Sequence, residues 1–237
     1  MQEIRRSAER GYADHGWLRS YHSFSFADYF DPRYVDFGPL RVINEDRVQP
    51  GAGFGTHAHR DMEILSYVLS GALSHKDSMG NGSTIRPGDV QRMSAGRGVQ
   101  HSEFNGSNSE PVHFLQIWIM PERRGIEPGY EERHFDAAER RGRLRLIASP
   151  DRAAGSVLIH QDARVYAGLF DGAETATLEL AVGRRSYVHV ARGQIDVNGA
   201  ALSSGDALKL TDTDAVAVRD GRQAELLLFD LPAAAAS

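Results

Sequence analysis

Residues 51–63 read GAGFGTHAHRDME and contain a His-x-His pair, His57 and His59. Side chains at positions i and i+2 of a β-strand point to the same face of a sheet. If this stretch is a strand, the two imidazoles therefore aim at one point. A His-x-His pair alone arises readily by chance in a chain with 10 histidines, so the prediction needs a second stretch beside it.

Residues 96–105 read GRGVQHSEFN and provide that second stretch. Its His-x-Glu pair, His101 and Glu103, has the same spacing of two. If the two strands are neighbours, four side chains converge in the interior of a barrel. Three imidazole nitrogens and one carboxylate oxygen suit Fe(II), Mn(II), Co(II), Ni(II), Cu(II) or Zn(II).

Four ligands in an octahedral shell leave two positions open for water, O₂ or a substrate oxygen. A purely structural metal site is normally closed and often rich in thiolates, whereas this chain has no cysteine. Imidazoles bind metal in the neutral form, so metal affinity is expected to fall at acidic pH. The open site predicts chemistry and not only structure.

The composition is that of an ordinary globular protein, with 41% hydrophobic and 25% charged residues among 237. The absence of cysteine excludes disulfides, thiolate zinc sites, iron–sulfur clusters and cysteine nucleophiles. A net charge of −5 gives no electrostatic reason to bind nucleic acid. The first 16 residues are polar and charged, and no run of about 18 apolar residues occurs. We therefore expect no signal peptide, no membrane association and a cytoplasmic location.

Short segments rich in Val, Ile, Leu and aromatic residues, separated by Gly, Pro, Asn or Asp, predict an all-β fold. One or two polar helical turns are expected within residues 130–141. The predicted strands are 41–43, 63–70, 113–120, 144–148, 156–159, 177–182, 187–190, 194–197 and 225–231.

The strand pattern occurs twice along the chain. Gly71, which ends the run YVLSG, has a counterpart 122 residues later in Gly193. The Gly-Asp turn at residue 88 recurs 117 residues later, and the run that ends at Pro121 recurs 111 residues later. The shrinking offset indicates two similar barrels in tandem, the second with shorter loops. We place the join within residues 121–142 and the domains at 1–135 and 136–237.

The spacing of both stretches resembles the two-part cupin pattern, G-x₅-H-x-H-x₃-E followed by G-x₂-H-x₃-N. Gly51 and Glu63 frame the first part, and Gly98 and Asn105 frame the second. The resemblance implies two cupin barrels, each a double-stranded β-helix or jelly roll.

Runs 54–63, 94–103 and 116–119 are also similar to the pirin family, in particular to its bacterial quercetin 2,3-dioxygenases. The resemblance implies an enzyme that opens the ring of a quercetin-like flavonol with O₂. It implies one divalent metal ion, Fe(II) first and Mn, Co, Ni, Cu or Zn otherwise, in the N-terminal barrel. The implied ligands are His57, His59, His101 and Glu103, and Glu103 is also the expected catalytic base.

Glu63 is the alternative carboxylate. It is the ligand position in many cupins, and its odd number places it on the same face as His57 and His59. In the pirin resemblance Glu103 takes that role. Glu63 then either orients a ligand histidine or is a buried polar residue with its own partner.

The second barrel is expected to be degenerate and without metal. The repeat offsets put Glu179, Ala181, Val218 and Asp220 at the ligand positions, and none of these is a histidine. The remaining histidines are interpreted as structural; they are His15, His22, His75, His113, His134, His160 and His189. The aromatic segment 21–34 either forms a pocket wall or packs as core.

Two other functions remain open at this point. Some pirins are metal-dependent redox sensors that regulate a protein partner, with dioxygenase activity incidental. An isomerase or sugar-binding cupin predicts a polar pocket, whereas action on a flat phenol predicts an apolar one.

Overall fold

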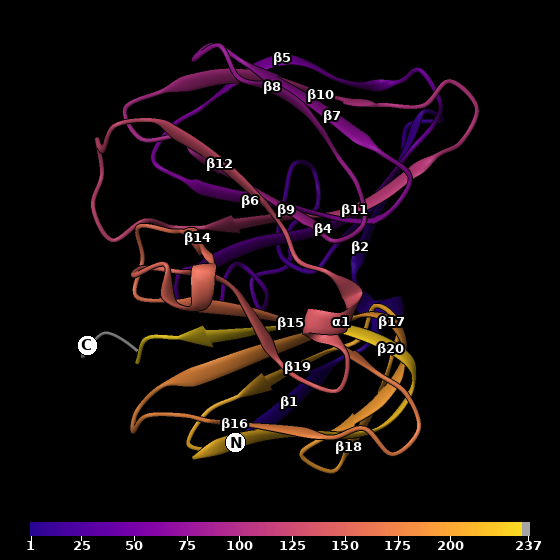
Figure 1. The fold of residues 1–237 in the computed structure, drawn as a ribbon, viewed down its shortest axis with the longest axis vertical. Coiled ribbons are helices and arrows are strands. Elements are labelled where there is room, and N and C mark those ends of the chain that lie inside the picture. The colour runs from indigo at the N-terminus through magenta and orange to yellow at the C-terminus, as the bar shows by residue number, and fades with distance from the viewer. Residues whose placement is uncertain (234–237) are drawn as a thin grey trace. The chain divides into compact units, whose positions relative to one another are not determined.

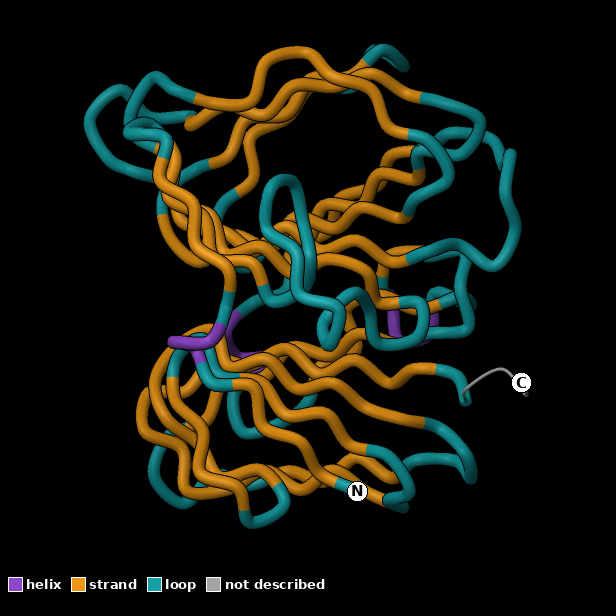
Figure 2. Tube along the Cα trace, turned by 180° about the vertical axis from the view of Figure 1, so that it is seen from behind, coloured by secondary structure: helices purple, strands orange, loops and turns teal. Residues whose placement is uncertain are grey.

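The computed structural model describes residues 1–233; residues 234–237, which fall in the predicted second domain, lie outside the described part. Within residues 1–233 the regular secondary structure is almost all β-strand (Figures 1 and 2), with one α-helix, α1 (Ala137–Arg140), and two 3₁₀ turns, η1 (Ser7–Glu9) and η2 (Ala153–Gly155). The all-β prediction is confirmed. The described residues contain no helix with the length and apolarity needed to cross a bilayer.

The chain forms two compact units. The N-terminal unit comprises Gly11–His134 and Val157–Gln161, and the C-terminal unit comprises Met1–Arg10, Phe135–Ser156 and Asp162–Ser237. The first residues belong to the C-terminal unit because β1 (Gln2–Arg5) pairs with β19 (Ala207–Leu210) in that unit's sheet. The division into barrels at 1–135 and 136–237 stays a prediction. It differs from the structure at β1, which belongs to the C-terminal unit.

The N-terminal unit has two antiparallel sheets. The larger has the strand order β12-β9-β6-β11-β4-β3-β2 and the smaller β5-β10-β7-β8. The larger sheet contains β2 (Gly11–Asp14), β3 (Leu18–His22), β4 (Leu40–Val48), β6 (Glu63–Ser70), β9 (Asp89–Ser94), β11 (Val112–Ile119) and β12 (Gly129–His134). The smaller contains β5 (Gly53–His59), β7 (Leu73–Asp77), β8 (Gly82–Ile85) and β10 (Val99–Asn105). The two-residue strand β14 (Val157–Leu158) also belongs to this unit.

Alternation of buried and exposed residues along these strands separates core from surface. Phe114, Val112 and Val68 are buried in one cluster of the N-terminal unit together with Leu73 and Ile85 of the smaller sheet. Because both sheets contribute apolar side chains to this cluster, it fixes the two layers of the barrel that carries the histidines.

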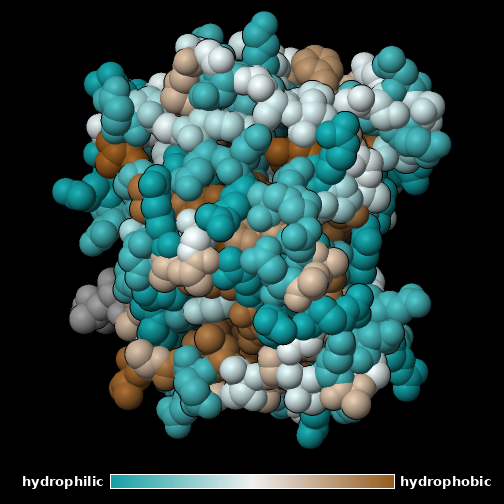
Figure 3. Space-filling model, viewed as in Figure 1, coloured by the Kyte–Doolittle hydropathy of each residue, from teal (hydrophilic) through white to brown (hydrophobic). Residues whose placement is uncertain are grey.

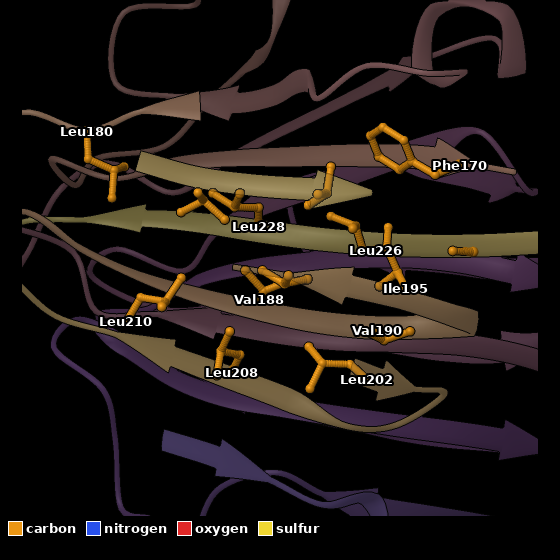
Figure 4. Close-up of a cluster of buried hydrophobic side chains, with 14 residues drawn as sticks. Phe170, Leu180, Val188, Val190, Ile195, Leu202, Leu208, Leu210, Leu226 and Leu228 are labelled. Carbon is orange, nitrogen blue, oxygen red and sulfur yellow. The ribbon is translucent and has the colours of Figure 1, made fainter. Parts of the chain in front are cut away.

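The C-terminal unit is built on the long strands β17 (Arg185–Val197) and β20 (Ala215–Leu231). Its other strands are β13 (Arg145–Ser149), β15 (Arg164–Phe170), β16 (Ala176–Glu179), β18 (Ala200–Ser203) and the β1–β19 pair. Figure 4 shows the core between them, where Leu226 and Leu228 of β20 lie near Val188 and Val190 of β17. On the face drawn in Figure 3, hydrophilic side chains cover most of the surface.

The strand order repeats between the units. β16-β20-β17-β18 corresponds to β5-β10-β7-β8, and β1-β19-β17-β20-β15-β13 corresponds to β12-β9-β6-β11-β4-β3. The long strand β17 runs through both layers and takes the place of β6 and β7 of the N-terminal unit. In the same way, β20 takes the place of β10 and β11. The predicted tandem repeat is confirmed.

The repeat extends to single residues. Gly71 lies in the turn between β6 and β7, and Gly193 lies at the equivalent point of β17. The φ angle is +80° at Gly71 and +69° at Gly193. A Cβ atom would lie 2.7 Å from the carbonyl oxygen of Pro111 at the first site and 2.3 Å from that of Arg222 at the second. Both positions therefore require glycine, because the backbone is left-handed and a neighbouring strand is too close for a side chain.

Of the one or two helical turns predicted within residues 130–141, one is present. Residues 129–134 form strand β12, and only Ala137–Arg140 forms a helical turn. β12 pairs with β9 in continuous register, from Gly129 opposite Ser94 to His134 opposite Asp89. Such pairing satisfies the backbone groups of a polar segment that carries no apolar periodicity.

Candidate metal centre

Three of the four predicted ligands, His57, His59 and His101, lie together where β5 and β10 pair. His57 lies directly opposite His101 in the antiparallel register, and a β-bulge follows between His101 and Glu103. The ring centroid of His57 lies 4.7 Å from that of His59 and 4.5 Å from that of His101. One ring nitrogen from each of these three histidines lies within 4.8 Å of the other two. The i, i+2 argument therefore holds for His57 and His59, which form one group with His101.

Hydrogen bonds indicate which ring nitrogens face the centre. His57 Nδ1 is 2.8 Å from the carbonyl oxygen of Gly55, which can only accept, so Nδ1 carries the proton. His57 Nε2 then presents its lone pair, and it lies 3.0 Å from His101 Nε2.

His101 is held from behind by His75 and Asp77. His101 Nδ1 lies 3.4 Å from His75 Nδ1, and His75 Nε2 lies 3.2 Å from Asp77 Oδ2. Because the carboxylate accepts from His75 Nε2, His75 Nδ1 is an acceptor, and it faces His101 Nδ1 and Gln91 Nε2, each at 3.4 Å. His75 was interpreted as structural from the sequence. In the structure His75 contacts Asp77 and also His101, a predicted ligand, and the spacing of the sequence did not indicate this contact.

Glu103 is buried, with 1% of its surface exposed. Gln116 Nε2 donates to Oε2 of Glu103 at 2.7 Å, and Ser66 Oγ donates to Oε1 at 3.1 Å. Its carboxylate forms a second group of candidate ligands with His75 and His101, again within 4.8 Å of one another. Burial raises the pKa of Glu103 to about 7, against the lowering effect of both hydrogen bonds.

Burial also keeps the imidazoles neutral. It lowers the pKa of His59 to about 4, with a further lowering by His57. Burial, together with the neighbouring histidines, lowers the pKa of His101 to about 3. The neutral imidazole is the form that binds metal, so these shifts prepare the cluster for a cation and not for a proton.

Glu63 lies in a different cluster. It is fully buried on β6, accepts a hydrogen bond from Ser94 Oγ at 2.9 Å, and lies 3.4 Å from His160 Nδ1. Neither group of candidate metal ligands contains it. Of the two roles considered for Glu63, the buried polar residue with its own partners agrees with these contacts.

A pocket of about 680 Å³ opens onto the histidines, and we call it the aromatic pocket. His57, His59 and Glu103 contribute to its wall. Seven further lining residues are aromatic or leucine: Tyr12, Trp17, Leu18, Phe26, Tyr29, Phe54 and Trp118. Residues 26–29 are part of this wall, so the pocket-wall interpretation of the aromatic segment is confirmed there, while Phe24 is core.

The sequence did not single out several of the residues that shape this site. Trp118 packs edge-on against His59 at a centroid distance of 4.9 Å, and Gln116 and Ser66 hold Glu103. The alternation along β11 that puts Gln116 on one face was the available signal, but it does not tell which face meets the pocket.

In the C-terminal unit, β16 pairs with the start of β20 as β5 pairs with β10. Ala176 faces Val218 and Glu179 faces Ala215. The expectation that this barrel holds no metal stays a prediction.

Comparison with known proteins agrees with the resemblance. The sequence model of the pirin family matches residues 3–119, and the model of the quercetinase C-terminal cupin domain matches residues 146–231. The chain is 47% identical over 232 residues to quercetin 2,3-dioxygenase of Escherichia coli K12, covering 98% of this chain and 99% of that one. This chain belongs to the pirin family. The two predicted tandem cupin domains are confirmed, and this pirin is quercetin 2,3-dioxygenase-like.

Solved structures of pirins agree closely with the fold. The crystal structure of YhhW from E. coli matches with a TM-score of 0.94 and 46% identity, covering 100% of both chains. YhhW in complex with nickel(II) matches with a TM-score of 0.93 and 45% identity, covering 98% of this chain and 100% of that one. A divalent metal is thus bound by a pirin very similar to this one.

Proposed function

We propose that this pirin is a metal-dependent dioxygenase that opens the ring of quercetin-like flavonols with O₂. The ligands in this proposal are His57, His59, His101 and Glu103, with Fe(II) as the native ion. The observation that carries the proposal is the aromatic pocket, because it brings aromatic side chains suited to a flat phenol against His57 and His59 of the three-histidine group. An isomerase or a sugar-binding cupin would need a more polar wall.

The donor set fits a divalent ion. His57 Nε2 and His101 Nε2 lie 3.0 Å apart, and a ring nitrogen of His59 lies within 4.8 Å of both, so the three imidazoles would hold one divalent ion. When bound, such an ion supplies Lewis acidity that favours the ionised form of a phenol.

The side chains of the site divide the remaining work. The aromatic walls hold the flat ring system and exclude water. The carboxylate of Glu103 can take the proton of the flavonol 3-hydroxyl, because it lines the pocket and a carboxylate oxygen accepts a proton from a bound hydroxyl group. Gln116 and Ser66 keep both carboxylate oxygens in place during that transfer.

The test uses the metal-free protein loaded in turn with Fe(II), Mn(II), Co(II), Ni(II) or Cu(II). Quercetin absorbance and O₂ uptake are followed together, with free metal and His57→Ala protein as controls. Coupled loss of quercetin and O₂ above both controls supports the proposal. No turnover above free metal with any of these ions contradicts it.

The second function, a metal-sensing regulator of a protein partner, gains no specific support from the site. It would be favoured by negligible turnover combined with metal-dependent capture of a partner. A cytoplasmic location is part of the proposal, as is the absence of nucleic-acid and membrane partners.

A further inference from the structure

One wall of the aromatic pocket carries a row of buried polar side chains. Ser20 and His22 come from β3, and Asn44 and Asp46 come from the neighbouring β4; all four line the pocket. Each has only 3–4% of its surface exposed. The antiparallel register places Ser20 opposite Asp46 and His22 opposite Asn44.

Three of these four residues are satisfied within the row. His22 Nδ1 lies 2.8 Å from Asn44 Oδ1, and Ser20 Oγ lies 3.4 Å from His22 Nδ1. Asp46 differs, because its Oδ1 is buried and has no hydrogen-bond partner in the described part of the chain. A buried acceptor without a partner costs free energy, and in a native structure it calls for an explanation.

The row continues toward the metal centre. Asn44 faces Gln116 of β11 in the register, and Gln116 donates to Glu103 at 2.7 Å. Asp46 faces Phe114 on the same strand. Asp46 and Glu103 therefore belong to one continuous pocket wall, and a single ligand that occupies this pocket can meet both carboxyl groups.

We propose that Asp46 accepts a hydrogen bond from a phenolic hydroxyl group of the bound flavonol and thereby selects substrates by their hydroxylation pattern. This inference rests on the proposed function and adds its specificity determinant. A site built to hydrogen-bond a substrate hydroxyl rejects the analogue that lacks it, because the buried group then stays unpaired.

A neutral hydroxyl fits this position better than a cationic group. Two members of the three-histidine group, His57 and His59, line the same pocket, and a divalent cation held by that group would repel a second positive charge. Burial raises the pKa of Asp46 to about 7, against a hydrogen bond from Ser20, so the carboxyl group does not require a cationic partner near neutral pH.

Binding can be read directly from the protein. Both tryptophans of the chain, Trp17 and Trp118, line the pocket, so a bound flavonol is expected to quench their fluorescence. The metal-loaded full chain is titrated with quercetin and with flavonols that each lack one of its hydroxyl groups. The variant is Asp46→Asn, with Asp46→Ser as a second replacement should the first not fold by circular dichroism.

The matched control is Glu45→Gln, which makes the same chemical change one residue earlier. Glu45 is absent from the pocket wall and pairs instead with Arg47 at 2.9 Å and with His113. We expect Asp46→Asn to weaken quercetin binding about ten-fold, because a neutral amide oxygen is a weaker acceptor than a carboxylate and its NH₂ group cannot accept at all. One flavonol of the series should bind about ten-fold more weakly than quercetin to the wild type and be indifferent to Asp46→Asn, whereas Glu45→Gln should bind every ligand as the wild type does.

The inference is overturned if Asp46→Asn binds every flavonol as the wild type does, or if it weakens all of them by the same factor. Turnover measured in parallel separates the two proposals. Selective binding through Asp46 without O₂ uptake would contradict the dioxygenase proposal alone, and turnover that is indifferent to Asp46 would contradict this inference alone.

Discussion

His57 Nε2 and His101 Nε2 face each other at 3.0 Å, while the Nδ1 atoms of the same two rings point away to Gly55 and His75. Two strands in register produce this relationship, because His57 and His101 are direct partners in the β5–β10 ladder. The carbonyl oxygen of Gly55 takes the Nδ1 proton of His57, which leaves His57 Nε2 as a lone-pair donor. Backbone pairing and partners outside the three histidines thus arrange the candidate metal centre.

Removing either facing imidazole should abolish tight metal binding. His57→Ala and His101→Ala each take away one of the two opposed nitrogens, and we expect neither variant to retain a stoichiometric divalent ion after dialysis. His134→Ala is the control, because His134 is on the surface and pairs with Asp89. Calorimetric titration with Ni(II) measures the outcome; retention of tight binding by both variants would be inconsistent with this ligand set.

His75 should act on the metal through His101. The His75 ring stacks on Tyr130 at a centroid distance of 4.9 Å. His75→Phe retains a ring for this stacking but removes the nitrogen that faces His101 Nδ1. Loss of such an orienting partner typically weakens metal affinity about 10–100-fold. The variant should therefore bind one ion more weakly in the same titration. An unchanged affinity would show that His75 serves packing alone.

The metal-free protein should carry a pH-dependent cost at Glu103. Its folded-state pKa of about 7 lies above the usual 4.5, so the native state holds its proton more tightly than the unfolded state does. This contribution to stability is fully present below about pH 4.5 and is lost as the pH rises through 7. Glu103→Gln removes this pH-dependent contribution. From pH 4 to pH 8 the free energy of unfolding of the variant should therefore rise relative to that of the wild type by up to roughly 3 kcal/mol.

Urea unfolding in the presence of a chelator at both pH values measures this difference. An equal effect of Glu103→Gln on the free energy of unfolding at the two values would contradict the burial of an ionisable carboxyl group at this position.

The aromatic wall should set substrate affinity without affecting the metal. Phe26 lies edge-on to Trp118 at a centroid distance of 5.4 Å, and both line the pocket. Phe26→Ala should raise the KM for quercetin several-fold and leave metal content unchanged. Phe30→Ala is the matched control, because Phe30 lies in the same loop, is 73% exposed and is absent from this wall. Equal KM values for the two variants would remove the wall from substrate binding.

The sequence predicted the site where the period of a strand was enough. His57 and His59 share a face because they are two apart, and the paired glycines Gly71 and Gly193 show the repeat because only glycine fits those bends. The rest depends on which strands become neighbours. His75 reaches His101 through the β7–β10 pairing, and Asp46 reaches the pocket through β4; neither pairing can be derived from local spacing. Strand β12 (Gly129–His134) was not predicted for the same reason, since its conformation is set by pairing with β9.

The most direct test of the metal centre is elemental analysis of the protein purified from its own host, beside the His57→Ala and His101→Ala variants prepared in the same way. We predict one divalent transition-metal ion per wild-type chain and close to none in either variant. A wild-type chain without metal, or variants that retain one ion per chain, would contradict the account.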